Sequence, residues 1–467
     1  MVINVLLAIG VLASQLRFLD KTNDVHAFGR ELSPLPADMF TTFTHPAYPV
    51  HKMRIKHLED LCENAYSGYI DIEARHLFFY FFESRTNVNL DPVVMWINGV
   101  GPGCSSSLGA FMELGPCNIH EHGPKYNPHW VIILSITSDL NSTIFFLDQP
   151  VNAGFSYADH GERVTTTDEA AVDVAAFVAI FFETFSEFRG GAFHMAGESY
   201  TGRYLPVFAS AVYDANVLAL RKVAPLTSVL IGNGITDFTS CSLLISFQRL
   251  LTHPNRMYSS YYDIMCTTAS VDPILPISDC VRLKQTVRHF CLLAWIKQSC
   301  IDKFDAIACH EAEDFCGVET GQKFWSTTEN PYDISRDCEV TCLSLLRLLL
   351  CRHIKAWLDL PAVRHSLGVS PKVGNFSSCS IPVVLDFMAA GDDLHTSNDY
   401  VVELLERGIR MLVYVGNYDC VCNWISNLAW MNSLEWTLGV GFTFWELQEW
   451  FINCSRAGLT KSARYEA

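Results

Sequence analysis

The stretch Phe193-His-Met-Ala-Gly-Glu-Ser-Tyr-Thr-Gly-Arg-Tyr204 decides the fold of this chain of 467 residues. An apolar strand pattern leads into Ser199, and an amphipathic segment, Leu205–Ala209, follows at once. Gly197 and Gly202 flank the serine, because larger residues do not fit where a chain reverses this sharply. The pattern predicts a strand, a tight turn that exposes the serine hydroxyl, and a helix whose N-terminus lies beneath it.

A serine on such a turn is typical of the nucleophile elbow of the α/β-hydrolase fold, where a strained backbone holds the hydroxyl above the sheet. Thr201 stands where a glycine or alanine is expected. On this stretch alone, an ordinary strand-to-helix turn with a solvated serine is therefore the alternative.

Strands and helices alternate along the chain, which predicts an α/β class with a mainly parallel sheet and helices on both faces. Tyr66–Ile72 and His76–Glu83 predict an aromatic hairpin. Further strands are predicted at Val93–Asn98, Ile144–Asp148, Ser228–Ile235 and Arg410–Val415, and helices at Asp168–Phe188, Tyr400–Arg407 and Asn423–Trp436.

The composition changes within the chain. Residues 241–355 carry seven cysteines between Cys266 and Cys338 and few strand signals, which predicts a disulfide-rich cap inserted over the carboxyl edge of the sheet. The α/β-hydrolase core is expected at 61–240 and 356–467. Residues 16–60 lack clear periodicity and predict a pro-segment or an extended arm.

Charge and cysteine content restrict the class of protein. The 33 basic and 50 acidic residues give a net charge of −17 without any basic run, which excludes a nucleic-acid-binding protein. Seventeen cysteines indicate an oxidising compartment. Residues 1–15 resemble a signal peptide, and their apolar run is too short for a membrane span. The sequons at Asn141, Asn375 and Asn453 agree with a glycoprotein of the secretory route, either vacuolar, lysosomal or secreted.

Six motifs in order resemble the serine carboxypeptidases, most closely the vacuolar carboxypeptidase Y branch, from about Leu61 to the C-terminus. They are Trp96-Ile-Asn-Gly-Val-Gly-Pro-Gly-Cys-Ser-Ser106, Glu113-Leu-Gly-Pro116, Phe146-Leu-Asp-Gln-Pro-Val-Asn-Ala-Gly-Phe-Ser-Tyr157, Gly197-Glu-Ser-Tyr-Thr-Gly202, Ile231-Gly-Asn-Gly-Ile-Thr-Asp237 and Asp419-Cys-Val-Cys-Asn-Trp424. The resemblance implies a hydrolase that releases C-terminal residues from peptides and proteins through an acyl-enzyme, without a metal or cofactor.

The resemblance also implies the catalytic roles. Ser199 would be the nucleophile, and Asp419 the acid that orients a histidine. The backbone N–H groups of Tyr200 and Gly101 would bind the oxyanion. From the residues alone, Asp419 could equally be the N-cap of the helix that follows, and Gly99-x-Gly101 fits a dinucleotide loop poorly, because the third glycine is missing.

Recognition of the substrate's free carboxylate would fall to Glu113 and Glu198, with Asn98 and Gly99 donating hydrogen bonds. Acidic side chains can hold a carboxylate only if they share protons, since like charges raise each other's pKa. Binding should therefore favour acidic pH. The alternatives are a solvated helix residue for Glu113 and a spacer in the turn for Glu198.

The family's disulfide pattern implies a set of pairs in and near the cap, and it implies that Cys422 is a free thiol near the active site. A metal site at Cys338-x3-Cys342 or Cys420-x-Cys422 is the alternative, and an oxidising compartment disfavours it. The implied pairs are Cys104–Cys379, Cys266–Cys280, Cys291–Cys316, Cys300–Cys309 and Cys338–Cys342.

The chain departs from the family pattern in three places. The triad histidine of the family follows the acid, whereas the sixteen histidines here end at His395, before Asp419. Val100 is an extra residue in the oxyanion loop, and 131–138 and 241–255 are apolar expansions without a motif. Two hypotheses follow: a serine carboxypeptidase whose given sequence is incomplete, or an inactive α/β-hydrolase scaffold that at most binds peptide C-termini. An acyltransferase with the same triad is also compatible with the motifs.

The missing base leads to the first prediction. A serine hydroxyl is a weak nucleophile until a base takes its proton, and loss of one triad member lowers turnover on the order of 10⁶-fold. We expect the 467-residue chain to release C-terminal residues at almost no rate and to label poorly with a fluorophosphonate. Addition of a C-terminal segment with the histidine should restore activity. Ordinary turnover by the purified chain would show that an upstream histidine acts as the base.

Overall fold

The structure is a computed structural model. It describes residues 40–45, 48–58, 61, 65–85, 87, 89–127, 142–218, 223–237, 257–287, 305, 307–311, 315, 319, 323–324, 327–337, 352–452 and 454–463. The signal-peptide-like segment 1–15, the expansions 131–138 and 241–255, and the sequons at Asn141 and Asn453 lie outside these residues. Asn375, the third sequon asparagine, is exposed.

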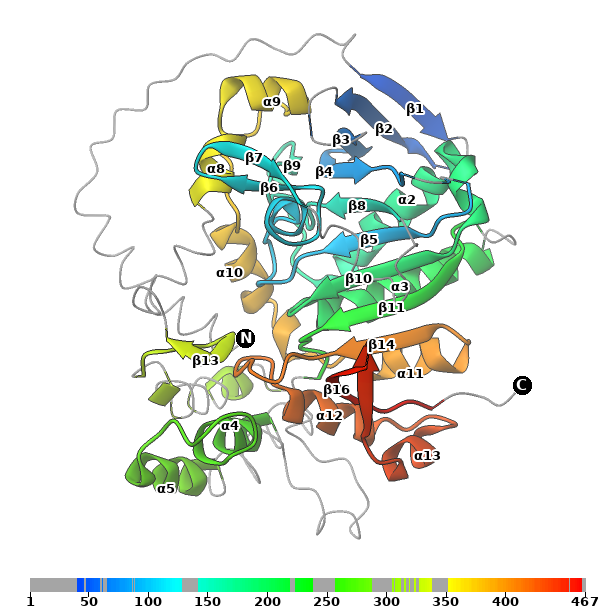
Figure 1. Ribbon diagram of the computed structural model, residues 1–467. Helices are drawn as coiled ribbons and strands as arrows, with labels where there is room; N and C mark the ends of the chain where they lie inside the picture. The colour runs from blue at the N-terminus through cyan, green and yellow to red at the C-terminus, as the bar shows by residue number, and fades with distance from the viewer. Residues whose placement is uncertain are drawn as a thin grey trace, which may run out of the picture.

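A ten-stranded mixed sheet runs through the core, and its main path has the order β1-β2-β3-β4-β8-β5-β10-β11-β14 (Figure 1). The four N-terminal strands are antiparallel, and the strands from β8 to β14 are parallel. The parallel part follows the predicted strands closely. The bounds are β1 Thr41–His45, β2 Tyr48–Leu58, β3 Ala65–Ile72, β4 Arg75–Phe82, β5 Val93–Ile97, β8 Thr143–Leu147, β10 Phe193–Glu198, β11 Leu226–Gly232 and β14 Arg410–Tyr414, with β9 Tyr157–Ala158 beside β4.

The sheet begins earlier than the sequence predicted. β1 and β2, which fall within the expected arm at 16–60, pair with β3 and belong to the main sheet. Met53, Ile55 and Leu58 of β2 are buried against its faces. The segment is short of apolar residues because β2 lies near the sheet edge, where only some side chains reach the core.

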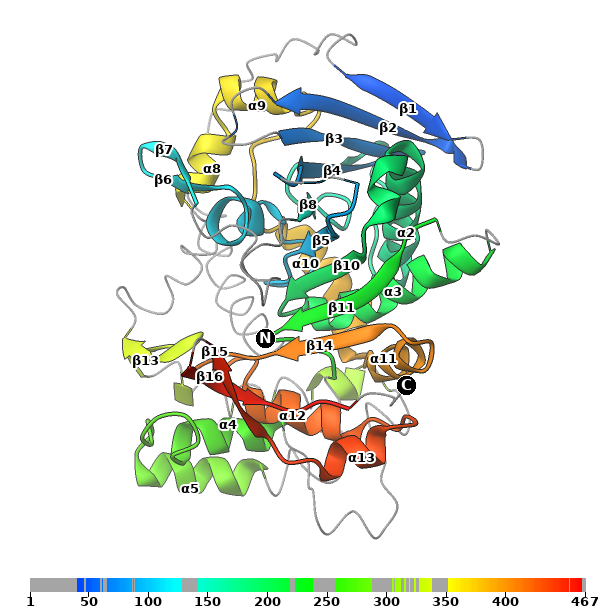
Figure 2. The same cartoon turned by 45° about the vertical axis from the view of Figure 1, so that its right-hand side comes forward.

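Helices cover both faces, as predicted, and alternate strand residues separate two cores (Figure 2). On one face, Phe79, Met95 and Phe145 pack against α2 (Thr167–Thr184) and α3 (Thr201–Leu218). On the other face, the neighbouring residues Tyr80, Trp96 and Phe146 pack with the helical turn η2 and with α8 and α9. The bounds are η2 Gly109–Glu113, α8 Arg352–Leu358, α9 Pro361–Leu367, α10 Ile381–Ala389 and α11 Asn398–Glu406.

Helix ends differ slightly from the prediction. α2 ends at Thr184 instead of residue 188, and a separate 3₁₀ turn, η4 (Ser186–Gly190), follows it. α12 spans Trp424–Ser433, with Asn423 as its N-cap, since the Asn423 side chain accepts a hydrogen bond from the Ser426 N–H. Apolar periodicity continues past both helix ends, so the sequence pattern alone did not locate them.

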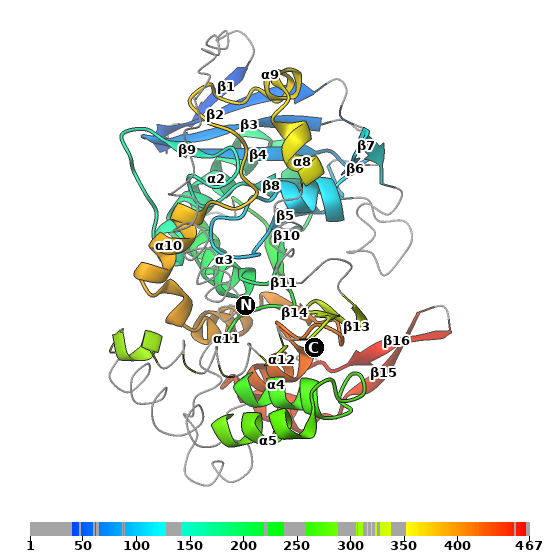
Figure 3. The same ribbon diagram turned by 90° about the vertical axis from the view of Figure 1, so that its left-hand side faces the viewer.

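The described part of the cap lies against the segment that follows β14. Helices α4 (Met257–Cys266) and α5 (Ile277–Thr286) form a small core with α12 at one end of the molecule (Figure 3). The hairpin of β12 (Glu329–Asn330) and β13 (Asp333–Asp337) is joined to this segment by hydrogen bonds, from Cys420 N–H to Pro331 O and from Ile334 N–H to Tyr418 O. The described part of the cap thus contacts the segment that leaves the carboxyl end of β14.

The remaining elements are peripheral. β6 and β7 form a small hairpin, and α13 leads into a second, exposed hairpin of β15 and β16 that projects from the cap end (Figure 3). Within the described ranges, none of the helices combines the length and the apolar character that a bilayer crossing needs. The bounds are β6 Cys117–His120, β7 Gly123–Tyr126, α13 Gly439–Phe444, β15 Gln448–Ile452 and β16 Ser455–Thr460.

Two of the five predicted disulfides, Cys104–Cys379 and Cys266–Cys280, are present. Cys309 is also disulfide-bonded, and its predicted partner Cys300 lies outside the described residues. At least one cysteine of each of the other two predicted pairs lies outside them as well. The sequence analysis missed Cys117, which is disulfide-bonded too.

The two disulfides should contribute unequally to stability. Cys104–Cys379 closes a span of 275 residues and Cys266–Cys280 a span of 14. Loop entropy therefore gives the first more than about 4 kcal/mol and the second about 3 kcal/mol. We expect replacement of Cys104 and Cys379 by serine to lower the free energy of unfolding more than the same change at Cys266 and Cys280. Urea unfolding of the two variants measures this, and a reversed order would contradict it.

Candidate active site

Ser199 lies at the sharp turn between β10 and α3, in the conformation that the sequence predicted. Its φ of 64° is left-handed, a region that residues other than glycine rarely adopt. The Ser199 N–H donates to Gly232 O at 2.9 Å, and Ser199 O accepts from the Ile235 N–H at 2.9 Å. A Cβ on Gly202 would lie 2.6 Å from the Ile235 backbone, so only glycine allows this packing.

Asn98, directly after β5, joins the two predicted carboxylates. Its Nδ2 donates to Glu113 at 3.3 Å and to Glu198 at 3.2 Å. Its Oδ1 accepts from Trp96 Nε1 at 3.0 Å and from the Gly109 N–H at 2.8 Å. These two donors fix the amide, so the NH₂ group has to point at the carboxylates. The structure therefore brings Asn98, Glu113 and Glu198 together beside Ser199.

The two glutamates hold protons more tightly than ordinary glutamates do. Burial raises the pKa of Glu113 well above its usual value, and the charge of Glu198 raises it further. Burial likewise raises the pKa of Glu198. The protons of such a pair belong to both residues. Both side chains keep part of their surface exposed, so a ligand can reach them.

Asp419 follows β14 at the same edge of the sheet and is only 7% exposed. Its Oδ1 accepts from the N–H groups of Val421 and Cys422, at 2.7 and 3.1 Å, and its Oδ2 accepts from Asn233 Nδ2 at 2.7 Å. These bonds are made before α12 begins, and Asn423 caps that helix, so the N-cap interpretation of Asp419 is wrong. Burial raises the pKa of Asp419 to about 6, although these donors oppose the shift.

Cys422 connects the acid to the nucleophile. Its thiol is free and buried, and its Sγ lies 3.9 Å from Ser199 Oγ, while its N–H donates to Asp419. The free thiol near Ser199 that the resemblance implied is therefore confirmed. Cys420, two residues earlier, is a second free and buried thiol, and it packs into the cap core.

The predicted oxyanion donors are not both open to a ligand. The Tyr200 N–H donates to Gly99 O at 2.7 Å. Gly99 lies directly on the turn, where a Cβ would come within 2.4 Å of Glu198 O. Gly101, the second predicted donor, is buried in the same loop after the extra residue Val100. In this state the Gly99 carbonyl occupies the donor that an oxyanion would need.

Among the described residues, the hydrogen-bond donors to Asp419 are Val421, Cys422 and Asn233, and none of them is a histidine. The described residues also hold no group of three or more histidine, cysteine or acidic side chains that could bind a metal ion. The site as described therefore consists of a serine, a buried aspartate and a pair of glutamates joined by an asparagine.

Two residues of the site were missed by the sequence analysis. Asn233 donates to Asp419, and the fully buried Asp392 accepts from the Tyr200 hydroxyl at 2.7 Å. Asn233 stands in the quoted motif at residues 231–237, but no pattern in that motif assigns it a role. Asp392 belongs to no quoted motif.

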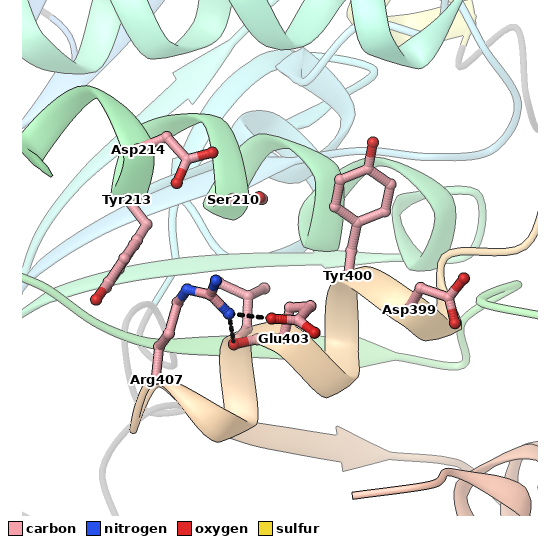
Figure 4. Close-up of a pocket in the computed structure, with 8 residues that line it drawn as sticks. Ser210, Tyr213, Asp214, Asp399, Tyr400, Glu403 and Arg407 are labelled. Atoms are coloured by element: carbon pink, nitrogen blue, oxygen red, sulfur yellow. Dashed lines mark hydrogen bonds and ion pairs between the residues drawn. The ribbon is translucent and has the colours of Figure 1, made fainter. Parts of the chain in front are cut away.

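A cavity of about 210 Å³ between α3 and α11 is separate from this site (Figure 4). Arg407 pairs there with Glu403 and lies 6.0 Å from the centre of the Tyr213 ring. The cavity contains none of the predicted site residues. Its lining consists of Ser210, Tyr213, Asp214, Asp399, Tyr400, Glu403, Leu404 and Arg407.

Comparison with known proteins gives a consistent result. Residues 58–465 match the profile of the serine carboxypeptidase family. The chain is 36% identical to carboxypeptidase Y of Candida albicans over 430 residues, which is 90% of this chain and 72% of that protein. It is 35% identical to carboxypeptidase Y of Saccharomyces cerevisiae over 406 residues, which is 86% of this chain and 70% of that protein.

A solved structure shares the fold. Kex1Δp, a prohormone-processing carboxypeptidase from Saccharomyces cerevisiae, superposes with a TM-score of 0.59 at 21% identity, covering 86% of this chain and 82% of that one. The family match covers residues 58–465, which include every described site residue, and the two relatives align with most of the chain. The chain belongs to the serine carboxypeptidase family of hydrolases.

Proposed function

We propose that Ser199 is the nucleophile of this carboxypeptidase and that the group formed by Asn98, Glu113 and Glu198 holds the carboxylate of the peptide terminus. The observation that carries the proposal is the fixed amide of Asn98, which directs one donor at two carboxylates adjacent to the turn of Ser199. An exopeptidase needs such a group at a set distance from its nucleophile, because the terminus then determines which bond is cleaved.

In this proposal the hydroxyl of Ser199 attacks the last peptide carbonyl, and the C-terminal residue leaves as the amine. The acyl-enzyme is then hydrolysed by water. The Ser199 proton must pass to a base, and Asp419 is placed to orient an imidazole that serves as that base. Cys422 lies between the two residues: its N–H donates to the Asp419 carboxylate, and its Sγ lies 3.9 Å from Ser199 Oγ.

Binding should favour acidic pH. Two ionised glutamates beside a substrate carboxylate would place three negative charges together, which costs free energy in a partly desolvated site. Protonation turns each glutamate into a hydrogen-bond donor that the carboxylate can accept. An ordinary glutamate loses its proton near pH 4.5. Because the pKa values of Glu113 and Glu198 are raised, these two side chains keep their protons to a higher pH.

An inactive scaffold that binds peptide C-termini is the second candidate. The observation that favours it is the hydrogen bond from the Tyr200 N–H to Gly99 O, which occupies one of the two predicted oxyanion donors. Both candidates require the carboxylate-binding group, and only the first requires turnover at Ser199.

We also propose that the protein enters the secretory route, and that its destination is a vacuole, a lysosome or the outside of the cell. The disulfides Cys104–Cys379 and Cys266–Cys280 support this, since such bonds persist in oxidising compartments. The exposed sequon asparagine Asn375 is accessible to glycosylation.

The glutamate pair should make stability depend on pH. A carboxyl group whose folded pKa is raised stabilises the fold only while it is protonated, so stability falls as pH rises above about 4.5 toward the folded pKa. The glutamine side chain of the Glu113→Gln variant is neutral at every pH. We therefore expect the unfolding temperature of this variant to fall less between pH 5 and pH 8 than that of the parent.

The buried Asp148 and Asp173 also have pKa values raised to about 6, so they too lower the stability of the parent as pH rises. The test is therefore the difference in pH dependence between the variant and the parent. Glu121→Gln, at an exposed turn, is the matched control and should follow the parent. Equal pH dependence in Glu113→Gln and the parent would contradict a shared proton.

Carboxylate recognition can be tested without turnover. In the Ser199→Ala variant, we expect a peptide with a free C-terminus to bind at least about 10-fold more tightly at pH 5 than at pH 8, as one titrating contact allows. The same peptide with a C-terminal amide should bind weakly at both values. Titration calorimetry measures both affinities. Equal affinity for acid and amide at pH 5 would rule out the proposed role of the glutamates.

A further inference from the structure

The motif Ile231-Gly-Asn-Gly at the end of β11 lies between the two predicted catalytic residues. β11 pairs with β10, which leads into Ser199, and on its other side with β14, which leads into Asp419. The carboxyl ends of neighbouring parallel strands meet at one edge of a sheet. The residues that follow β11 are therefore placed to contact both the nucleophile and the acid.

The side chain of Asn233 reaches the acid. Its Nδ2 donates to Asp419 Oδ2 at 2.7 Å, and its Oδ1 accepts from the Gly416 N–H at 3.2 Å. The opposite orientation of the amide would place its oxygen against the carboxylate and its NH₂ against an N–H group. Two partners of opposite character therefore fix this side chain.

The backbone around Asn233 holds the nucleophile. Gly232 O accepts from the Ser199 N–H, and the Ile235 N–H donates to Ser199 O. The Asn233 N–H donates to Tyr414 O, at the end of β14. A segment of four residues thus joins the serine, the acid and both flanking strands.

The backbone conformation of Asn233 indicates that its side chain matters. Its φ of 40° is left-handed, a conformation that glycine adopts freely and other residues adopt at a cost. If this turn served only to redirect the chain, glycine would be the better residue.

The pattern of donors on Asp419 specifies where a base can bind. Oδ1 already accepts two N–H groups, from Val421 and Cys422, which use both of its lone pairs. Oδ2 accepts only from Asn233 among the described donors, so it keeps one lone pair. An imidazole N–H can therefore be accepted at Oδ2, in a direction that Asn233 determines.

We propose that Asn233 is a positioning residue that fixes the carboxylate of Asp419, so that Oδ2 receives the N–H of the catalytic base. This inference rests on the proposed function, in which Asp419 is the acid of the triad.

The first test needs no turnover. In Asn233→Gly the backbone turn is relieved but the donor is lost, so the ionised Asp419 becomes less stable and its pKa rises. We expect the unfolding temperature of Asn233→Gly to fall further below that of the parent at pH 8 than at pH 5. When both proteins also carry Asp419→Asn, the difference in unfolding temperature that Asn233→Gly causes should be the same at pH 5 and pH 8.

Four other titratable groups face Asp419. Burial raises the pKa values of the Cys420 and Cys422 thiols and of the Tyr332 hydroxyl, so these three stay protonated at both pH values. The carboxyl group of Glu198 can change charge between them. The Asp419→Asn background separates the effect of Glu198 from that of Asp419. Asn152→Gly is the matched control, since Asn152 is exposed, has a φ of 72° and donates to Glu162 O. It should change stability equally at both pH values. A pH-independent effect of Asn233→Gly would overturn the inference.

The second test uses turnover of a peptide substrate by the chain extended with a C-terminal segment that carries the histidine, since the 467-residue chain itself is expected to be almost inactive. We expect Asn233→Gly to lower kcat by about 10- to 100-fold, the effect of one hydrogen bond to a charged group, with little change in KM. Asn152→Gly should match the parent. If Asp419→Asn lowers kcat and Asn233→Gly does not, the inference is wrong. If Asp419→Asn itself leaves kcat unchanged, the assignment of the acid fails instead, and the positioning role fails with it.

Discussion

The left-handed backbone of Ser199 is the constraint on which the site depends. A residue other than glycine at φ 64° costs about 1–3 kcal/mol, and it persists only where the surroundings leave no alternative. Here the surroundings are the two hydrogen bonds from the segment after β11 and the close contact of Gly202 with Ile235. A change that moves Gly232 or Ile235 would also move Ser199, because both residues are hydrogen-bonded to its backbone.

Asp392 extends this constraint to the opposite side of the turn. Its buried carboxylate accepts from the hydroxyl of Tyr200 and from the N–H and hydroxyl of Thr167, at the start of α2. Arg203, one turn into α3, pairs with it at 3.4 Å and supplies the compensating charge. A buried carboxylate without such partners would be strongly destabilising. The residue after the nucleophile is thus held by its side chain as well as by its backbone.

The local features of this site could be predicted from residue patterns alone. Its long-range contacts were expected only where the family resemblance implied them, as for Asn98 with Glu198, and were otherwise missed. The strand, turn and helix around Ser199 follow from apolar periodicity and glycine spacing, and β5 and β8 follow from short apolar runs between turn signals. Asn233 and Asp419 are separated by 186 residues, and Asp392 and Tyr200 by 192. No periodicity relates residues so far apart, because topology alone brings them together. β2 was missed for a related reason, since its burial depends on pairing with β3 and not on a strong pattern of its own.

The contact between Gly99 O and the Tyr200 N–H has a chemical consequence. If the Tyr200 N–H binds the oxyanion, as proposed, this contact has to open when the tetrahedral intermediate forms, because one N–H group cannot serve the Gly99 carbonyl and an oxyanion at full strength. A charged acceptor forms hydrogen bonds about twice as strong as a neutral carbonyl does, which favours the exchange once charge develops. Gly99 lacks a side chain, and a Cβ there would come within 2.4 Å of Glu198 O, so only glycine lets this peptide lie so close to the turn. Opening this contact costs free energy that is recovered only once the charged intermediate forms, so the contact lowers transition-state stabilisation relative to a preformed oxyanion hole.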